Sequence, residues 1–371
     1  MEKILLLGGG YASLSFIKNL NKNTLKKYDI TLISKEDYHY QSVLLHQVVS
    51  SGKNININYK EILPQEVTFI KDQILEIKEN EVVGLKAKYD YDFLIIGLGF
   101  NSDDFKIPGV KEYAFDIVDF KNSFTIYEKM KNYDNNLEIA VCGGGFSGIE
   151  LLGNLAHDLK KINKNFKLKC IEFMPTILPI FDKDLALQAQ LYLEKLGIEF
   201  YLNSKIIQCQ KDGVIIQKNN AEEKINANFI LWTAGVQGNP VIGNSSFFNS
   251  QRNKIEINAF LNPLNQEKPM NNIFVLGDCA LLKDANNKAY APTAQLANQQ
   301  SQYLAKRFNN DFKFNDFFHY QNKGILCSLG ENYAIGVIKN KSIKGSLASY
   351  IKKFIELQWL LKLKGLKALL G

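Results

Sequence analysis

Several features that mark metal sites, disulfide-stapled domains and membrane spans are missing from this sequence. The five cysteines are odd in number, lie far apart and form no Cys-x-x-Cys pair, so neither a disulfide framework nor a zinc site is indicated. His39 and His46 are isolated from cysteine or carboxylate clusters, so no metal is expected. The longest apolar runs have only strand length, well short of the roughly 20 residues that a spanning helix needs. The chain begins without a secretory pattern and contains no low-complexity run, which favours a globular protein of a reducing cytoplasm.

The composition is that of a soluble protein with more than one domain. The chain has 371 residues, of which 46% are hydrophobic and 22% are charged. Because domains usually contain about 100–200 residues, this length allows two or three of them, each with its own core.

The first glycine-rich segment has the pattern of a strand, a tight turn and a helix. Residues 4–7 form a continuous apolar run, Gly8 to Gly10 follow at once, and apolar residues then recur at helical spacing. In this setting Gly8 permits the turn, Gly10 lets the backbone approach a pyrophosphate, and the helix N-terminus attracts the anion. Ser13 stands at the third glycine position, where a small residue still allows helix and strand to pack closely. Taken alone, the loop is equally compatible with a glycine turn of any α/β protein.

The second glycine-rich segment is more specific. After the apolar run of residues 139–142, Gly143, Gly145 and Gly148 have the full Gly-x-Gly-x-x-Gly spacing, and a helical pattern follows. The next predicted strand ends in Glu172, 29 positions after Gly143. A carboxylate there accepts hydrogen bonds from a ribose diol and repels a 2′-phosphate, which predicts NADH rather than NADPH. A surface glutamate that merely ends a strand is the alternative.

The two loops are expected to bind different nucleotides. The second strand of the first unit, "DITLIS", ends in Ser34 and is followed by Lys35, so the expected acid is displaced or missing and Lys35 is a candidate contact there. Near the other end, "NNIFVLGDCA" presents Asp278 after an apolar strand and a tight turn, where its carboxylate is placed to bind a polyol. Two such loops predict FAD at the first, NADH at the second and hydride transfer between the two ring systems.

These segments resemble those of the two-dinucleotide-binding-domain flavoproteins, and among them the type II, non-proton-pumping NADH:quinone oxidoreductases. The likeness runs along nearly the whole chain, through "GGGYASL", "YHYQSVLLHQV", "YDFLIIGLGF", "VCGGGFSGIELLGNL", "FMPTILPIFD", "LWTAGVQGNP", "FVLGDCA" and "APTAQLANQQ". The resemblance implies an α/β fold with two Rossmann-like domains. It predicts a discontinuous FAD domain of residues 1–108 and 245–320, an NADH domain of residues 109–244 inserted between them, and a membrane-association region of residues 321–371.

The same resemblance implies further site residues. The segment "AQLANQ", residues 294–299, is similar to the family's AQxAxQ quinone signature, with Gln295 and Gln299 on one helix face and Ala294 leaving space for a flat ring. Glu150, behind the second loop, is expected to accept or relay protons beside the flavin. Lys344 resembles a family lysine whose charge stabilises reduced flavin. Solvent-facing glutamines, a helix-dipole glutamate and a surface lysine are the alternatives.

The last part of the chain carries the whole excess of positive charge. Residues 339–371 contain eight lysines and one acid, Glu356, and their net charge of +7 equals that of the whole protein. An apolar face at helical spacing accompanies these lysines, formed by Leu347, Tyr350, Ile351, Phe354, Ile355, Trp359, Leu361, Leu366 and Leu370. This pattern is typical of helices that lie in the headgroup region of an anionic membrane, and a helix that packs a homodimer is the alternative. No other feature suggests nucleic-acid binding.

The sequence thus predicts a peripheral enzyme at the cytoplasmic face of the plasma membrane. It is expected to pass electrons from NADH through FAD to a membrane quinone without pumping protons. A sulfide:quinone oxidoreductase is the rival enzyme, but it needs a redox cysteine pair and no NADH site. A ferredoxin or thioredoxin reductase fits less well because Cys-x-x-Cys is absent, and an NADH-binding redox sensor is the alternative from another class.

Overall fold

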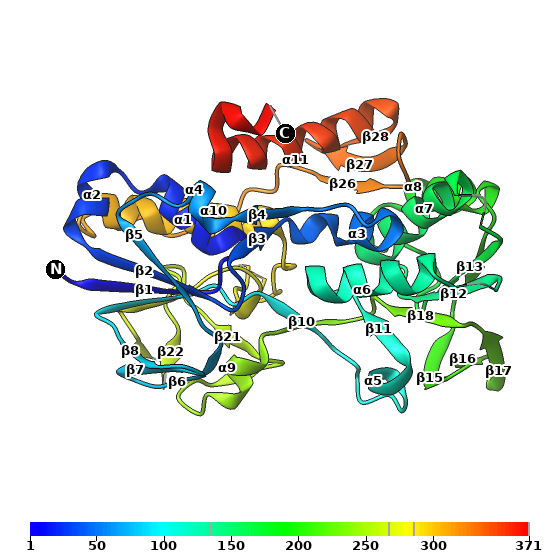
Figure 1. The fold of residues 1–371 in the computed structure, drawn as a ribbon, viewed down its shortest axis with the longest axis horizontal. Helices are drawn as coiled ribbons and strands as arrows, with labels where there is room; N and C mark the ends of the chain where they lie inside the picture. Colours follow the sequence, from blue (N-terminus) through cyan, green and yellow to red (C-terminus); the bar gives the residue numbers. More distant parts are fainter. Residues whose placement is uncertain (134, 163, 266–267, 285, 370–371) are drawn as a thin grey trace.

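A computed structural model describes residues 1–371 except 134, 163, 266–267, 285 and 370–371. Two parallel sheets lie side by side, helices cover them, and a C-terminal region runs above both (Figure 1). This arrangement confirms the predicted α/β class with two Rossmann-like sheets.

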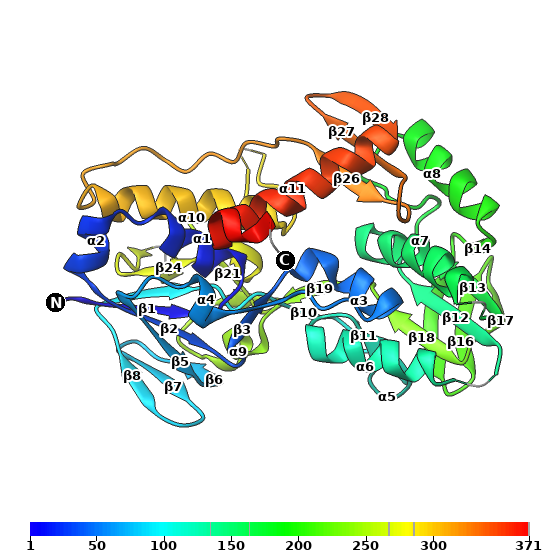
Figure 2. The ribbon, with the colours of Figure 1, turned by 45° about the horizontal axis from the view of Figure 1, so that its top comes forward.

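The first sheet has the strand order β24-β9-β1-β2-β5, and all of its strands are parallel. The strands are Lys3–Leu7 (β1), Asp29–Ser34 (β2), Val67–Lys71 (β5), Phe93–Ile96 (β9) and Ile273–Val275 (β24). Residues 4–7 are almost inaccessible, because a parallel strand is covered on both faces. Helices Tyr11–Asn19 (α1) and Ala294–Asn309 (α10) pack against each other beside this sheet (Figure 2). Both β24 and α10 come from late in the chain, so this half of the molecule is assembled from two distant segments.

The second sheet has the order β11-β18-β12-β13-β14 and is also parallel. Its strands are Ala114–Asp116 (β11), Leu137–Cys142 (β12), Phe166–Ile171 (β13), Ile198–Tyr201 (β14) and Phe229–Trp232 (β18). Helices Phe120–Lys131 (α6), Phe146–Lys161 (α7) and Lys183–Lys195 (α8) belong to this half of the molecule (Figure 1).

Smaller elements surround the two sheets. Phe100–Ser102 (β10) pairs with Val236–Gly238 (β19) where the chain passes from one half to the other and back. Two antiparallel sheets consist of Ile74–Ile77 (β6), Glu81–Gly84 (β7) and Lys88–Asp90 (β8), and of Lys205–Gln210 (β15), Gly213–Lys218 (β16) and Ala221–Asn226 (β17). The remaining elements are Lys22–Lys27 (α2), Tyr38–Tyr40 (β3), Ser42–Leu44 (η1), Leu45–Ser51 (α3), Asn56–Asn58 (β4), Tyr59–Ile62 (α4), Val110–Tyr113 (α5), Pro240–Asn244 (α9), Ser250–Gln251 (β20), Lys254–Glu256 (β21), Leu264–Asn265 (β22), Lys268–Pro269 (β23), Gly277–Cys279 (η2) and Ala280–Leu281 (β25).

The C-terminal region consists of an antiparallel three-stranded sheet and a long helix. Strands Ile325–Ser328 (β26), Ala334–Ile338 (β27) and Lys341–Gly345 (β28) precede helix Ser346–Lys364 (α11), and a short 3-10 turn, Gly365–Leu369 (η3), follows. Figure 2 shows α11 running from the C-terminal strands to a position above α1. Among the described residues, no helix has the length and apolar character needed to cross a membrane.

One assignment within the tail is wrong. The sequence pattern places Trp359 on the same exposed apolar face as Phe354 and Leu366, but Trp359 is 6% exposed whereas Phe354 is 56% and Leu366 80% exposed. With about 3.6 residues per turn, positions 354 and 359 point in directions about 140° apart, so one helix face cannot hold both. Leu370, assigned to the same face, lies outside the described residues.

Candidate functional site

A large cavity of about 1710 Å³ lies between the two halves of the molecule. It extends from the first glycine loop to Glu150 behind the second loop, and Trp359 and Lys352 of α11 form part of its wall. Ligand pockets usually measure about 300–1,000 Å³, so this cavity has room for more than one ligand.

The first loop has the geometry that an anion site needs. Gly8 has φ +88°, and an added Cβ would lie 2.5 Å from the carbonyl oxygen of Gly97, so only glycine fits there. Gly10 is different, because no protein atom lies within 4 Å of an added Cβ. The open side of Gly10 faces the cavity at the N-terminus of α1, where free N–H groups and the helix dipole favour a phosphate.

The second loop shows the same difference between glycines that close packing requires and glycines that face open space. Gly143 has φ +118°, and its added Cβ would lie 2.9 Å from the Ala234 nitrogen. An added Cβ at Gly148 would collide with the carbonyl oxygen of Gly143, whereas one at Gly145 would meet nothing within 4 Å. Gly145 is therefore free for the close approach of a ligand at the N-terminus of α7.

Glu172 lies beside the second loop. Its Oε2 accepts a hydrogen bond from the Gly144 N–H at 2.5 Å, and its Oε1 accepts one from the Met174 N–H at 2.8 Å. The carboxylate is thereby fixed at the end of β13, with lone pairs left over for a ribose hydroxyl.

The contacts at the first loop differ partly from the sequence interpretation. Ser13 is fully buried, and its Oγ lies where an added Cβ on Gly97 would approach within 2.9 Å, so a small residue is needed on each side. Lys35 pairs with Asp119 at 3.1 Å at the cavity edge. Glu36, two residues past the end of β2, also lines the cavity and pairs with Lys121 at 2.6 Å. Glu36 is thus a candidate for the displaced acid, and the acidic residues Glu36 and Asp37 that follow Lys35 were the signal for it.

Asp278 enters the cavity from the turn after β24. The Gly277 N–H donates to the buried Gln300 side chain at 2.7 Å, which fixes the turn that presents Asp278. Burial raises the pKa of Asp278 to about 6, although the Lys254 ammonium lowers it in part. The carboxyl group is therefore placed to bind a hydroxyl-rich portion of a ligand.

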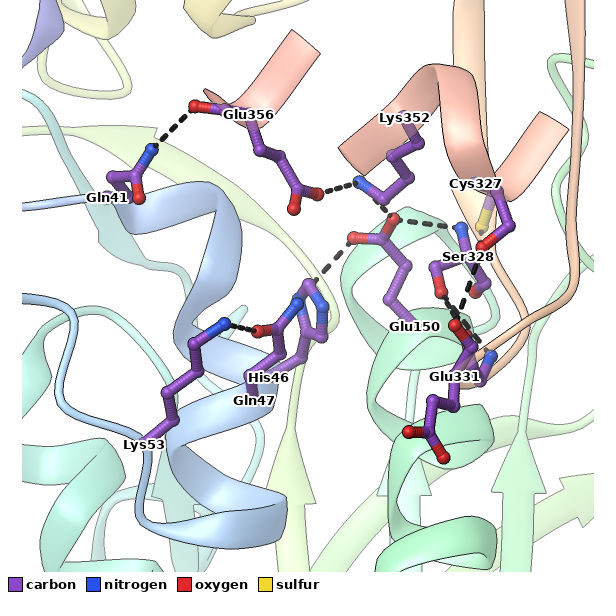
Figure 3. Close-up of polar contacts among 12 residues, drawn as sticks. Gln41, His46, Gln47, Lys53, Glu150, Cys327, Ser328, Glu331, Lys352 and Glu356 are labelled. Atoms are coloured by element: carbon purple, nitrogen blue, oxygen red, sulfur yellow. Dashed lines mark hydrogen bonds and ion pairs between the residues drawn. The ribbon is translucent and has the colours of Figure 1, made fainter. Parts of the chain in front are cut away.

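Glu150 lies at the centre of a buried polar cluster (Figure 3). Its carboxylate is 2.9 Å from the Lys352 ammonium, accepts the Ser328 N–H at 3.0 Å and lies 3.5 Å from Nδ1 of His46. Lys352 also pairs with Glu356 at 3.3 Å, one helical turn farther along α11. Side chains from α3, α7 and α11 therefore meet at one wall of the cavity.

The pKa values of the two carboxyl groups in this cluster, Glu150 and Glu356, are shifted in opposite directions. Burial by itself raises the pKa of Glu150, but the Lys352 ammonium and the Ser328 N–H outweigh it, so the pKa lies below the ordinary value. Burial dominates at Glu356 and raises its pKa. His46 is neutral at pH 7 because burial lowers its pKa to about 4. One carboxylate is held ionised beside a second that retains its proton more readily.

The structure brings Gln295 and Gln299 to the cavity with Ala294, but it also gives both amides partners. Gln295 donates to the Gly324 carbonyl at 3.2 Å and accepts from the Lys323 N–H at 2.9 Å and the Tyr320 hydroxyl at 3.1 Å. Gln299 donates to the Gln321 carbonyl at 2.8 Å and accepts its N–H at 2.9 Å. These glutamines hold residues 320–324 against α10 and so shape the cavity wall.

Lys344 is not brought to the cavity. Its exposed side chain on β28 donates to Gln188 of α8 at 2.7 Å. Lys352, eight residues later, is the tail lysine that lines the cavity, where its ammonium pairs with Glu150. The signal for Lys352 was weak, since it is one of eight tail lysines and only its spacing of four from Glu356 sets it apart.

The described residues contain no group of three or more histidine, cysteine, aspartate or glutamate side chains placed to hold a metal ion. All five cysteines are buried, and none of them lines the part of the cavity that the structure describes.

The model of the family described as pyridine nucleotide-disulphide oxidoreductase matches residues 2–301 of the chain. This match spans most of the chain, so the chain belongs to the class of pyridine nucleotide-disulphide oxidoreductases.

Relatives narrow the class further. The type II NADH:quinone oxidoreductase of Staphylococcus epidermidis is 35% identical, over 98% of this chain and 96% of that protein. The type II NADH:quinone oxidoreductase of Staphylococcus aureus is 32% identical, also over 98% of this chain and 96% of that protein. The chain therefore belongs to the type II NADH:quinone oxidoreductase family.

Solved structures share the fold. NDH2 from Plasmodium falciparum in complex with NADH has a TM-score of 0.86 at 22% identity and covers 98% of this chain, with 96% of that chain matched. The sulfide:quinone oxidoreductase from Aquifex aeolicus has a TM-score of 0.81 at 19% identity, over 98% of this chain and 92% of that one. At these identities the likeness concerns the fold alone and does not choose between electron donors.

Proposed function

We propose that this enzyme oxidises NADH and reduces a quinone, with FAD held at the first glycine loop and NADH at the second. The observation that carries the proposal is the continuous cavity that joins the open Gly10 to Glu150 behind the second loop. FAD bound there supplies the two-electron chemistry that links NADH to quinone. The proposed reaction does not include proton pumping.

Different residues are proposed to bind FAD, NADH and the quinone. Gly10 and the N-terminus of α1 hold the FAD pyrophosphate, and Glu36 and Asp278 bind hydroxyl groups of FAD. Glu172 binds the adenosine ribose of NADH. Ala294 leaves room for the quinone ring, and Gln295 and Gln299 keep residues 320–324 in place around it. The matching domain limits are residues 1–108 with 245–320 for FAD, 109–244 for NADH and 321–371 for the C-terminal region.

Glu150 is proposed to handle the protons that quinone reduction consumes. Its carboxylate lines the cavity and is linked through Lys352 to Glu356, which retains a proton more readily. An ionised carboxylate connected in this way can accept a proton from the second carboxyl and pass it on at the cavity.

The electron donor and acceptor are tested by stopped-flow absorbance of the purified holoenzyme. NADH is expected to reduce the bound flavin, and a water-soluble quinone to reoxidise it. NADPH is expected to react more than ~10-fold less efficiently, because its 2′-phosphate meets Glu172. Flavin reduction by sulfide but not by NADH would favour the rival sulfide:quinone oxidoreductase, and rapid flavin reduction with no turnover on any quinone would favour a redox sensor.

We propose that α11 also attaches the protein to an anionic membrane, at the cytoplasmic face where NADH is available. Leu347, Tyr350 and Phe354 are 65%, 70% and 56% exposed and lie on one side of the helix. Exposed lysines, among them Lys344 and Lys353, flank this apolar strip. Lysines attract anionic headgroups while the strip inserts among them.

Serine at positions 347, 350 and 354 is expected to weaken binding to anionic vesicles by ~100-fold or more, since burial of each large apolar side chain contributes about 1.5–3 kcal/mol. Cosedimentation measures the effect. The matched control is Leu85→Ser with Phe173→Ser, two side chains 67% and 66% exposed that belong to neither α11 nor the C-terminal strands. A triple variant that still cosediments but changes from dimer to monomer in light scattering would assign the strip to a homodimer interface instead.

A further inference from the structure

The carbonyl group of Gly9, inside the first glycine loop, is held from two sides. The Tyr59 hydroxyl donates to it at 2.9 Å, and Nδ1 of His39 lies 3.2 Å from it. In a trans peptide the C=O of one residue and the N–H of the next point in opposite directions. With the Gly9 carbonyl fixed toward Tyr59 and His39, the Gly10 N–H points the other way, toward the open side of the loop.

His39 can donate to Gly9 only in one of its two neutral forms. The ring is 1% exposed, and burial lowers its pKa to about 4, so it is neutral at pH 7. Its Nε2 lies 3.0 Å from Nε1 of Trp359. An indole N–H can only donate, so Nε2 must accept and the proton of the imidazole must sit on Nδ1. Trp359 thereby selects the form of His39 that donates to the loop.

Trp359 reaches this position from the opposite end of the chain. It lies on α11, and its ring packs on that of Tyr11 with centroids 4.6 Å apart. Tyr11 is the first residue of α1, directly after Gly10, and its ring also forms a T-shaped contact with the His39 ring at a centroid distance of 5.4 Å. The C-terminal helix therefore contacts the glycine loop both through the Tyr11 ring and through the hydrogen bonds of His39.

We propose that Trp359 is a positioning residue for FAD, which acts through His39 to hold the Gly9–Gly10 peptide with its N–H directed at the FAD pyrophosphate. The proposal rests on the assignment of the first loop to FAD. It makes flavin retention depend on the docking of α11, so the helix that is proposed to meet the membrane also closes the flavin site.

The first test needs no variant. The chain has four histidines, so ¹⁵N-histidine labelling of the holoenzyme gives a tractable spectrum in which long-range ¹H–¹⁵N couplings distinguish the two neutral forms. His39 is expected to carry its proton on Nδ1. A proton on Nε2 in the wild-type protein overturns the proposal.

The second test uses the two tryptophans of the chain as a matched pair. Trp359→Phe keeps an aromatic ring against Tyr11 but removes the N–H, and it is expected to weaken FAD binding ~3- to 10-fold, the value of one net hydrogen bond. Trp232→Phe removes an equivalent N–H, which donates to the Asp103 carbonyl at 2.9 Å with no link to Gly9. Equal FAD dissociation constants for the two variants, measured by flavin release on dilution, overturn the proposal.

A double-mutant cycle separates the hydrogen-bond path from simple packing. His39→Ala is expected to weaken FAD binding, and Trp359→Phe is expected to add almost nothing in that background because its route to Gly9 is already broken. Additive losses would mean that Trp359 contributes packing alone, which overturns the proposal. If both variants leave FAD affinity unchanged but raise the KM for NADH, the assignment of the first loop to FAD is what fails.

Discussion

Replacing Glu150 with glutamine is expected to slow quinone reduction by about 10²–10⁴-fold, the usual contribution of a positioned acid or base. Flavin reduction by NADH is expected to change little, because hydride transfer needs no acid from the protein. Glutamine keeps the size of the side chain and can still accept the Ser328 N–H, so the fold at α7 should persist. Stopped-flow measurement of the two half-reactions in the same preparation gives both rates.

Glu172→Gln is the matched control for this prediction. It makes the same chemical change at the second loop, where the carboxylate accepts the Gly144 and Met174 N–H groups. It is expected to raise the KM for NADH and to leave the quinone half-reaction unchanged. Equal slowing of both half-reactions by Glu150→Gln would show that Glu150 supports the structure rather than the chemistry.

The pH dependence of Glu150 adds a second readout. The Lys352 ammonium holds the pKa of Glu150 below its ordinary value against the effect of burial. In Lys352→Met that charge is gone and no longer opposes burial, so the pKa of Glu150 rises. The acid limb of the pH–rate profile for the quinone half-reaction is therefore expected to move to higher pH. In the wild type, the lowering of this pKa also affects the free energy of unfolding. Because the pKa of Glu150 is lower in the folded protein than in the unfolded chain, ionised Glu150 stabilises the fold above the ordinary glutamate pKa of about 4.3. This contribution is lost as the pH falls through the lowered pKa of the folded protein.

Local sequence predicted the elements whose residues are neighbours along the chain. Both glycine loops could be found because an apolar strand, three positions with little or no side chain, and a helix follow one another within about 20 residues. Local backbone geometry also explains which glycines are required by the turn and which leave space for a ligand. Glu172 could be predicted for the same reason, because the next parallel strand ends at the same edge of the sheet as the loop.

Other features depend on contacts between distant segments and leave no local signal. Trp359 lies 320 residues from His39, its hydrogen-bond partner, and a helical apolar pattern does not reveal which side chain meets the body of the protein. Lys352 and Lys344 are both lysines of a basic tail, and the structure distinguishes them by their partners, Glu150 of α7 for Lys352 and Gln188 of α8 for Lys344. Gln295 and Gln299 have the predicted helical face, but their partners are backbone groups of residues 320–324 in a segment without a recognisable pattern.

The nucleotide assigned to each loop is tested most directly at the two open glycines. Gly10→Ala is expected to weaken FAD binding by ~10- to 100-fold, because the added methyl group stands where a phosphate approaches and a charge-assisted hydrogen bond is worth about 1.5–3 kcal/mol. Gly145→Ala is expected to raise the KM for NADH by a similar factor and to leave FAD in place. Flavin content after gel filtration and steady-state kinetics measure the two effects.

Both substitutions should leave the fold intact, which makes their effects on ligands interpretable. Gly10 and Gly145 have φ of −83° and −77°, values that alanine adopts without strain, and no protein atom lies within 4 Å of either added Cβ. Gly8→Ala supplies the contrast, because its φ of +88° and the Gly97 carbonyl oxygen at 2.5 Å predict a loss of thermal stability even without ligand. If Gly145→Ala releases the flavin and Gly10→Ala does not, the two nucleotides must exchange places, and Glu172 would then bind the ribose of FAD.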